Sequence, residues 1–136
     1  MNIQEDYVSF ETAKLLKEKG FNVLCYGRYS VRSKELHLDT TRPYNNGGIY
    51  QYSAPTLQMA MKWLREVHLI LYTIYHSLES GELRFLWRIE KLEQDKKHYV
   101  EELPGIEEYY KDSDESFTTY KEAEESLIKY CLENLI

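Results

Sequence analysis

Apolar residues between Ala54 and His68 recur at spacings of three and four, which predicts an amphipathic helix. Thr56 is a candidate N-cap, and Pro55 keeps the preceding residue out of the helix. The predicted apolar face of this helix consists of Leu57, Ala60, Met61, Leu64 and Val67. We expect the rest of the chain to pack around it.

Two further helices are predicted on either side of it. The first begins at Ser9, an N-cap, and ends at Gly20, a residue typical of helix C-termini. The last begins at a capping box formed by Thr119 and Glu122 and carries a wide apolar stripe to the end of the given sequence. Such a stripe indicates that the helix is either well buried or part of a dimer interface.

The period changes toward two between the first and second helices. Residues 21–29 and 34–39 predict two paired strands, and Gly27 in the first indicates a bulge or a close backbone approach. Residues 41–48, rich in Asn and Gly, predict a loop. Residues 49–52 then predict a short edge strand.

A second hairpin is predicted after the central helix. Residues 69–76 alternate and are rich in β-branched and aromatic types, so we prefer a strand to the main alternative, a continued helix. Ser80 and Gly81 mark the turn, and residues 83–90 return. We expect the core-facing side chains of the returning strand to be Phe85, Trp87 and Ile89, whereas Arg84, Arg88 and Glu90 face water.

Residues 93–116 are polar and contain Pro104 and Gly105, so we expect a long surface connection there. The elements together predict an α+β fold: an antiparallel sheet from two hairpins with three helices, in helix-hairpin-helix-hairpin-helix order, the helices mainly on one face. A chain of 136 residues fits a single domain over residues 1–136.

The charge is unevenly distributed. Residues 1–100 hold 14 Lys and Arg against 12 Asp and Glu, whereas residues 101–136 hold 3 against 11. The acidic end argues against binding to double-stranded DNA, which needs a basic face. No signal peptide or membrane-spanning stretch is evident, so we expect a cytoplasmic protein without membrane association.

The cysteines, histidines and short motifs of the sequence give little support for a catalytic site. Cys25 and Cys131 match no metal or redox spacing and are predicted to be buried free thiols. The four histidines show no ligand spacing, and a Cys25–His37 dyad across the first hairpin has no third residue to orient it. No nucleotide-binding or hydrolase motif is present, so we expect no cofactor, no metal and no catalytic residue. The backbone amides of the loop at residues 45–48 are an alternative site for a phosphate, although such loops more often only turn the chain.

The main candidate site is a cluster of tyrosines and arginines around the first hairpin. Guanidinium groups bind phosphates and tyrosine rings stack on bases, which is typical of nucleotide and single-strand sites. The same mixture is typical of protein interfaces and dimer seams. The candidate ligand-binding residues are Arg28, Tyr29, Arg32, Arg42, Tyr44, Tyr50 and Tyr52, with Tyr26 beside them.

One resemblance adds context. Residues 7–21, 54–68 and 128–136 resemble a group of small uncharacterised proteins encoded by phages and prophages of gut anaerobic bacteria. The resemblance covers the three predicted helices and leaves out the hairpins and the acidic loop. It implies a mobile-element context and no established reaction.

These observations favour a phage or prophage accessory protein that acts by binding, as a homo-oligomer, on a small nucleotide-type host signal or a host protein. The first alternative is a single-stranded nucleic-acid-binding module that uses the same cluster. The second alternative is a small hydrolase or transferase that uses His37.

Overall fold

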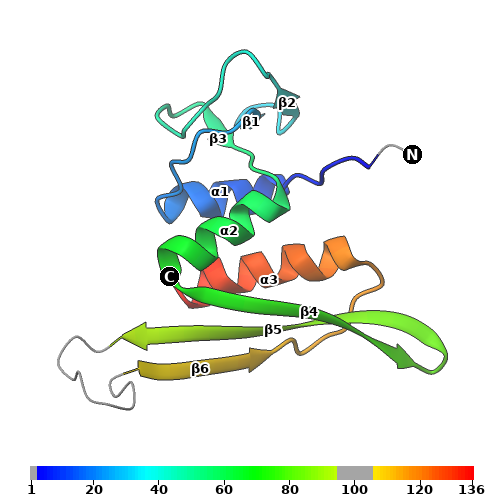
Figure 1. Ribbon diagram of the computed structural model, residues 1–136. Coiled ribbons are helices and arrows are strands. Elements are labelled where there is room, and N and C mark those ends of the chain that lie inside the picture. The colour runs from blue at the N-terminus through cyan, green and yellow to red at the C-terminus, as the bar shows by residue number, and fades with distance from the viewer. Residues whose placement is uncertain (1–2, 95–105) are drawn as a thin grey trace. The chain divides into compact units, whose positions relative to one another are not determined.

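The computed structural model describes residues 3–94 and 106–136. The fold is α+β, with three helices and antiparallel sheets (Figure 1). The strands form two separate three-stranded sheets, which corrects the prediction of one sheet from two hairpins. None of the helices in this part of the chain combines the length and the apolar character needed to span a membrane. The helices are α1 (Phe10–Glu18), α2 (Leu57–His68) and α3 (Tyr120–Asn134), and the strands are β1 (Gly27–Ser30), β2 (Leu36–Leu38), β3 (Gln51–Ser53), β4 (Ile70–Glu79), β5 (Glu82–Gln94) and β6 (Ile106–Asp112).

The chain divides into two compact units. The first comprises Met1–Lys62 and Ile128–Ile136, and the second comprises Trp63–Leu127. The boundaries fall inside α2 and α3, so each of these helices contributes to both units. A single domain over residues 1–136 stays a prediction.

The predicted ends of α1 are confirmed. The Ser9 hydroxyl accepts a hydrogen bond from the backbone N–H of Thr12 (3.2 Å), which satisfies one of the free donors at the helix start. Gly20 follows the C-cap with φ +89°, a conformation that glycine adopts without strain.

The other two helices also begin at their predicted caps. Thr56 accepts a hydrogen bond from the N–H of Met59 (3.1 Å), and Thr119 accepts one from the N–H of Glu122 (3.1 Å). The carboxylate of Glu122 accepts a hydrogen bond from the hydroxyl of Thr118 (3.1 Å). Since α3 buries its apolar stripe, the first of the two interpretations of that stripe is the one observed: Ala123, Leu127, Ile128, Cys131 and Leu132 are buried.

The first sheet has the strand order β2-β1-β3, so residues 51–53 form the predicted edge strand. Strand β1 is shorter than the predicted 21–29, because Cys25 makes only an isolated bridge with Tyr44. The close approach predicted at Gly27 is confirmed. A Cβ atom at this position would lie 2.4 Å from the carbonyl oxygen of Ala54, whose N–H donates to the Gly27 carbonyl (2.8 Å).

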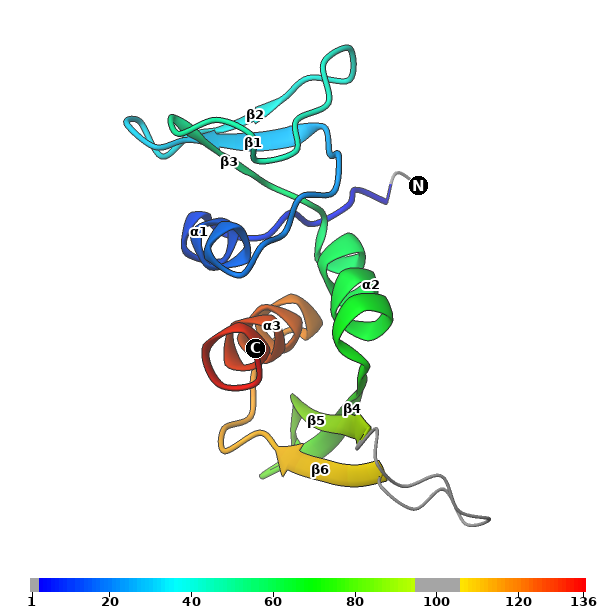
Figure 2. The ribbon, with the colours of Figure 1, turned by 90° about the vertical axis from the view of Figure 1, so that its left-hand side faces the viewer.

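Helix α1 packs against one face of this sheet (Figure 2). The ring of Phe10 meets that of Tyr29 edge-on, with centroids 5.7 Å apart, and that of Tyr52 at a tilt, 5.4 Å away. Tyr29 and Tyr52 are cross-strand neighbours, so the two rings form one aromatic surface for the helix.

The second sheet has the order β4-β5-β6, and its first two strands confirm the hairpin predicted after α2. The strand at 70–79 shows that the alternative of a continued helix is wrong. Ser80 and Gly81 both have positive φ (52° and 81°), as a two-residue hairpin turn of type I′ requires.

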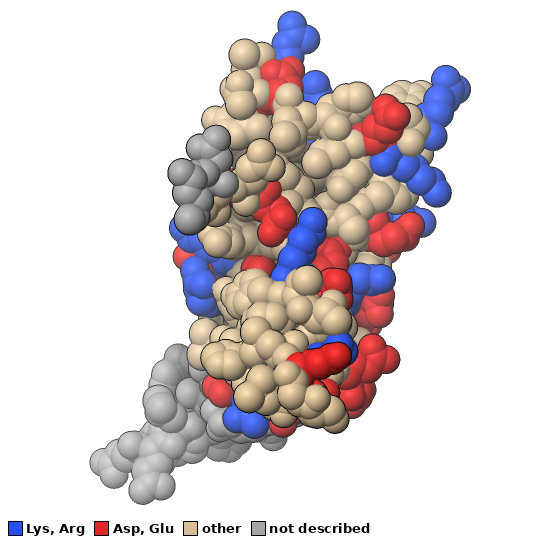
Figure 3. Space-filling model, turned by 90° about the vertical axis from the view of Figure 1, so that its right-hand side faces the viewer, with Lys and Arg blue, Asp and Glu red and all other residues tan. Residues whose placement is uncertain are grey.

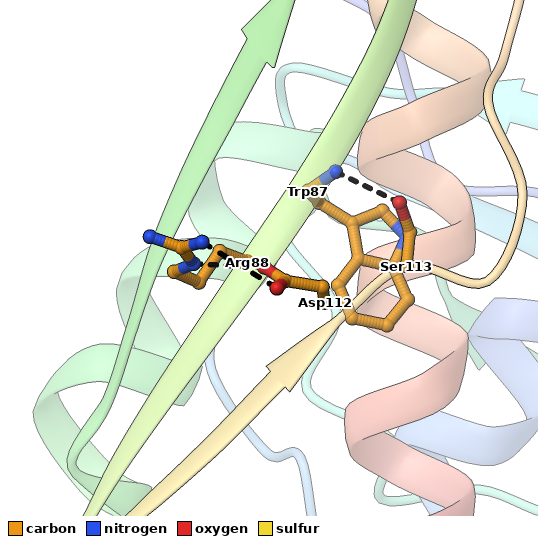
Figure 4. A network of polar contacts seen from close by, with 4 residues as sticks. All are labelled: Trp87, Arg88, Asp112 and Ser113. Atoms are coloured by element: carbon orange, nitrogen blue, oxygen red, sulfur yellow. Dashed lines mark hydrogen bonds and ion pairs between the residues drawn. The ribbon is translucent and has the colours of Figure 1, made fainter.

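The predicted alternation along β5 is confirmed at Trp87, Arg88 and Ile89, whereas Phe85, predicted to face the core, and Arg84 and Glu90, predicted to face water, are half-buried. Trp87 and Ile89 are buried, and the indole N–H of Trp87 donates to the hydroxyl of Ser126 on α3 (3.3 Å). Figure 4 shows Arg88, next along the strand, pointing to the other side, where it bonds Asp112 (2.8 Å). The backbone N–H of Trp87 donates to the hydroxyl of Ser113 (3.2 Å).

Strand β6 corrects the prediction of a surface connection over residues 93–116. Residues 106–112 pair antiparallel with β5, from Gln94 opposite Ile106 to Arg88 opposite Asp112. Its polar sequence gives no apolar period, but an edge strand needs only the backbone partners that β5 offers. Pro104 and Gly105 lie outside the described residues.

Candidate functional site

The structure divides the predicted tyrosine–arginine cluster between different surfaces. Tyr29 and Tyr52 lie on the α1 side of the first sheet and serve the packing of the unit. The Tyr29 hydroxyl donates to the carbonyl of Val8 (2.6 Å), and the ammonium of Lys17 lies 5.5 Å from the centre of the Tyr52 ring. The faces of these rings are therefore occupied by side chains of α1 and its surroundings.

Arg28 belongs to the opposite face of the sheet, because neighbouring residues of a strand point to opposite sides. Its guanidinium lies 3.6 Å from a carboxylate oxygen of Asp39. Hydrogen bonds from Thr41 lower the pKa of the Asp39 carboxyl, and the charge of Arg28 contributes less to this shift. Arg28 is thus partly neutralised by a residue that stays ionised at neutral pH.

The other members of the cluster lie on exposed segments. Arg32 is in the turn between β1 and β2, and Arg42 is in the loop after β2. Tyr26 is 53 % exposed just before β1. The structure brings together Tyr29 and Tyr52, and it does not place them on one surface with Arg28.

Tyr44 organises the segment 44–50, which we call the Tyr44 loop. Its hydroxyl accepts a hydrogen bond from the N–H of Gly48 (3.0 Å) and lies 3.2 Å from the carbonyl oxygens of both Gly48 and Gln51. The ammonium of Lys17 donates to the same two carbonyls. The amide and carbonyl of Gly48 are therefore used inside the protein, as a turn requires and a phosphate cradle does not.

Asn46 ties this loop to the rest of the unit. It adopts φ +66°, a left-handed conformation that asparagine tolerates better than most residues. Its side-chain amide donates to the carbonyl of Phe21 (2.8 Å) and accepts from the N–H of Ser53 (2.7 Å). One side chain thus joins the chain before β1 to strand β3.

The end of the loop exposes two large side chains. Ile49 is 76 % exposed and Tyr50 is 78 % exposed, although the Tyr50 carbonyl accepts a hydrogen bond from the N–H of Val31 (3.0 Å). The backbone is therefore held in place while both side chains project into solvent. An apolar pair on a fixed loop is suited to insertion into a partner's surface.

We expect replacement of Asn46 by alanine to lower the free energy of unfolding by about 2–3 kcal/mol, since two backbone groups lose their partner and alanine is strained at positive φ. Asn46→Gly is the matched control, because glycine relieves the strain but lacks the hydrogen bonds. Urea denaturation should place Asn46→Gly between the parent and Asn46→Ala. Equal stability of Asn46→Ala and the parent would show that the side chain does not hold the loop.

Cys25 and His37 do not form a nucleophilic pair in this structure. The Cys25 thiol is buried and bonds the carbonyl oxygens of Gly27 (3.5 Å) and Tyr44 (3.6 Å). Burial raises the pKa of this thiol, which disfavours the reactive thiolate. His37 is exposed on β2, opposite Arg28. Both cysteines are free and buried, as predicted.

His68 is the histidine with the most unusual surroundings. Its ring lies edge-on to Trp63, with centroids 4.5 Å apart, and its Nε2 atom is buried without a hydrogen-bond partner among the described residues. Burial, and secondarily the charge of Lys91, lowers the pKa of His68 below its ordinary value near 6.5.

This shift predicts a loss of stability in mild acid. Between the lowered folded pKa and the unfolded value near 6.5, the unfolded chain binds more protons, so the contribution of His68 is complete above that range and is lost as pH falls through it. Thermal unfolding from pH 8 to pH 5 should show this decline in the parent and a flatter profile in His68→Phe. His76→Phe is the control, because His76 is exposed, and it should keep the decline of the parent. An equal dependence of the unfolding temperature on pH in the parent and in His68→Phe would show that His68 does not cause the decline.

Known proteins add no identification. The chain matches no protein-family model, and searches of curated proteins and of solved structures give no match either. Within residues 3–94 and 106–136, no group of three or more His, Cys, Asp and Glu side chains is arranged to hold a metal ion. The candidate site therefore depends on the geometry of the Tyr44 loop.

Sequence reasoning selected Tyr44 and Tyr50 but missed Ile49, Asn46 and Lys17. The sequence predicts a strand over residues 49–52, whereas β3 begins at Gln51 and leaves Ile49 in the loop. The sequence does contain a signal for an exposed Ile49: this apolar residue follows two glycines, precedes a tyrosine and belongs to no alternating pattern. The contacts of Asn46 and Lys17 are between distant segments, and no local pattern predicts them.

Proposed function

We propose that this protein acts by binding another protein, and that the exposed tip of the Tyr44 loop, Ile49 and Tyr50, is the anchor. The observation that carries the proposal is the contrast between a fixed backbone and two side chains that are more than three-quarters exposed. A phage or prophage accessory protein directed at a host protein fits this mode of action.

The loop's internal hydrogen bonds support this use. Association orders side chains and loops at a cost in free energy, and a loop already held in one conformation avoids most of it. Aromatic and aliphatic anchors that enter a pocket supply a large share of the affinity of protein interfaces. Tyr50 offers a rigid ring, and Ile49 adds apolar area beside it.

The surroundings of the tip indicate the chemistry of the partner. Val31, which bonds the Tyr50 backbone, is followed by the exposed side chains of Arg32 and Lys34 in the β1–β2 turn. An apolar tip with basic neighbours fits an apolar pocket with an acidic rim. The rim charges would act mainly on the rate of association, which should fall as salt is raised.

Capture of a nucleotide or a single strand has less support. Arg28 is already paired with Asp39, and Tyr29 and Tyr52 face α1. Basic and acidic side chains are interspersed on the face of the molecule shown in Figure 3, whereas nucleic-acid sites gather basic residues along a groove. Hydrolysis through His37 has no oriented partner in the described residues.

Native mass spectrometry on protein purified gently from cells that produce it naturally tests the proposal. We expect the parent to carry a protein-sized additional mass that is absent from Ile49→Ser/Tyr50→Ser. Tyr26→Ala is the matched control, because Tyr26 is an exposed tyrosine of the same unit that is not part of the loop. An added mass of a few hundred daltons, lost in Arg28→Ala/Arg42→Ala and kept in the loop variant, would instead establish a small ligand.

A further inference from the structure

Among the residues that the structure describes, no strand pairs with the outer edge of β4. The orientation of the backbone groups along this free edge follows from the pairing on the other side of β5. Phe85 on β5 exchanges both backbone hydrogen bonds with Phe117 (2.8 Å each), away from β4. Its partner on β4, His76, therefore forms a non-hydrogen-bonded pair with it. The N–H and C=O of His76 thus point away from β5, toward the open edge.

The same orientation holds for every second residue of β4, because the two kinds of pair alternate along an antiparallel ladder. Among the described residues, no backbone hydrogen bond joins these edge groups to another segment. The residues whose backbone groups face the free edge are Tyr72, Ile74, His76 and Leu78, whereas Ile70, which follows the same alternation, is fully buried.

The two edges of this sheet differ in charge. The sequence of β6 contains Glu107, Glu108, Lys111 and Asp112, and charged residues on an edge strand discourage pairing with another chain. Strand β4 carries no Asp, Glu, Lys or Arg from Ile70 to Leu78. Of the two edge strands of this sheet, β4 therefore lacks the charged residues that discourage pairing, although the strand is ten residues long.

We propose that β4 pairs antiparallel with β4 of a second copy of this chain, about a two-fold axis at Ile74. This register sets Tyr72 opposite His76 of the second copy and places Glu79 opposite Leu69, so that no like charges meet. The two sheets become one continuous sheet across the axis.

Sedimentation of three proteins tests the pairing. His76→Pro removes an N–H that points away from β5, so the β4–β5 ladder keeps its bonds while the free edge is blocked. His76→Ala retains the N–H and is the matched control. We expect a dimer for the parent and for His76→Ala, and a monomer for His76→Pro. A monomeric parent at every attainable concentration, or a dimer that survives in His76→Pro, would overturn the proposal.

Spin labels test the register in a way that does not depend on His76→Pro, a variant that a folding defect could also make monomeric. Cysteines at Thr73 and at Glu79, both exposed, can be labelled while Cys25 and Cys131 are buried. From strand spacing and rise, the Cα atoms of the two copies should be about 8 Å apart at position 73 and about 34 Å apart at position 79. Similar distances at both positions would exclude this register. A foreign strand bound at the edge in place of a second copy would also overturn the proposal.

This proposal does not depend on the proposed function, because β4 belongs to Trp63–Leu127 and the Tyr44 loop to the other unit. The two can fail separately. His76→Pro should leave the partner mass attached through Ile49 and Tyr50 unchanged, and the loop variant should leave the dimer unchanged.

Discussion

Replacing Gly27 by alanine is expected to lower the free energy of unfolding by about 3 kcal/mol, because the methyl group meets backbone. The new Cβ would lie 2.4 Å from the carbonyl oxygen of Ala54 and 3.2 Å from the ring of Tyr7. The backbone at Ala54 cannot shift away without cost, since the N–H of Ala54 donates a hydrogen bond to the carbonyl of Gly27 itself (2.8 Å). Urea denaturation followed by circular dichroism measures the change.

Gly47→Ala is the matched control for this prediction. A Cβ at Gly47 would meet only the side-chain oxygen of Asn45, at 3.3 Å, and Asn45 is exposed and free to move. We expect little change in stability for this variant. If Gly27→Ala and Gly47→Ala were equally stable, the close approach of β1 to Ala54 would not constrain the fold.

Replacing Trp87 by alanine should lower the free energy of unfolding by about 3–5 kcal/mol, the usual cost of removing a large aromatic side chain from a core. Trp87 is only 3 % exposed, and its indole N–H donates to Ser126 on α3 (3.3 Å). The substitution leaves a cavity beneath the helix and an unpaired hydroxyl. Thermal and urea unfolding should both detect the loss.

Two variants separate the causes. Trp87→Phe keeps a ring in the core but cannot donate to Ser126, so it should be less destabilising than Trp87→Ala. Arg88→Ala removes the exposed ion pair with Asp112, a type of contact that contributes little to stability. A loss in Arg88→Ala as large as in Trp87→Ala would contradict the assignment of the core face of β5.

Local signals predicted the elements well where the pattern is strong. The caps at Ser9, Thr56 and Thr119 are polar side chains that bond backbone N–H groups nearby in sequence, so the information is local. The turn at Ser80 and Gly81 is equally local, because positive φ favours glycine. Alternation then identified the buried face of β5.

Features that depend on distant partners were not predictable. Strand β6 forms because β5 offers backbone groups, and its own sequence shows no apolar alternation. The separation of the strands into two sheets likewise follows from pairing and not from any single segment. At the candidate site, composition identified tyrosines and arginines, but the α1 contacts that occupy Tyr29 and Tyr52 come from Phe10 and Lys17.

The most direct test of binding through the Tyr44 loop is photo-crosslinking from position 50. A photoreactive phenylalanine analogue at Tyr50 projects from the exposed tip, and the same residue at Tyr26 is the control. We expect irradiation of cells to give one covalent protein adduct from position 50, none from position 26, and loss of that adduct when Ile49 is changed to serine. No adduct from position 50, or equal adducts from both positions, would contradict the account.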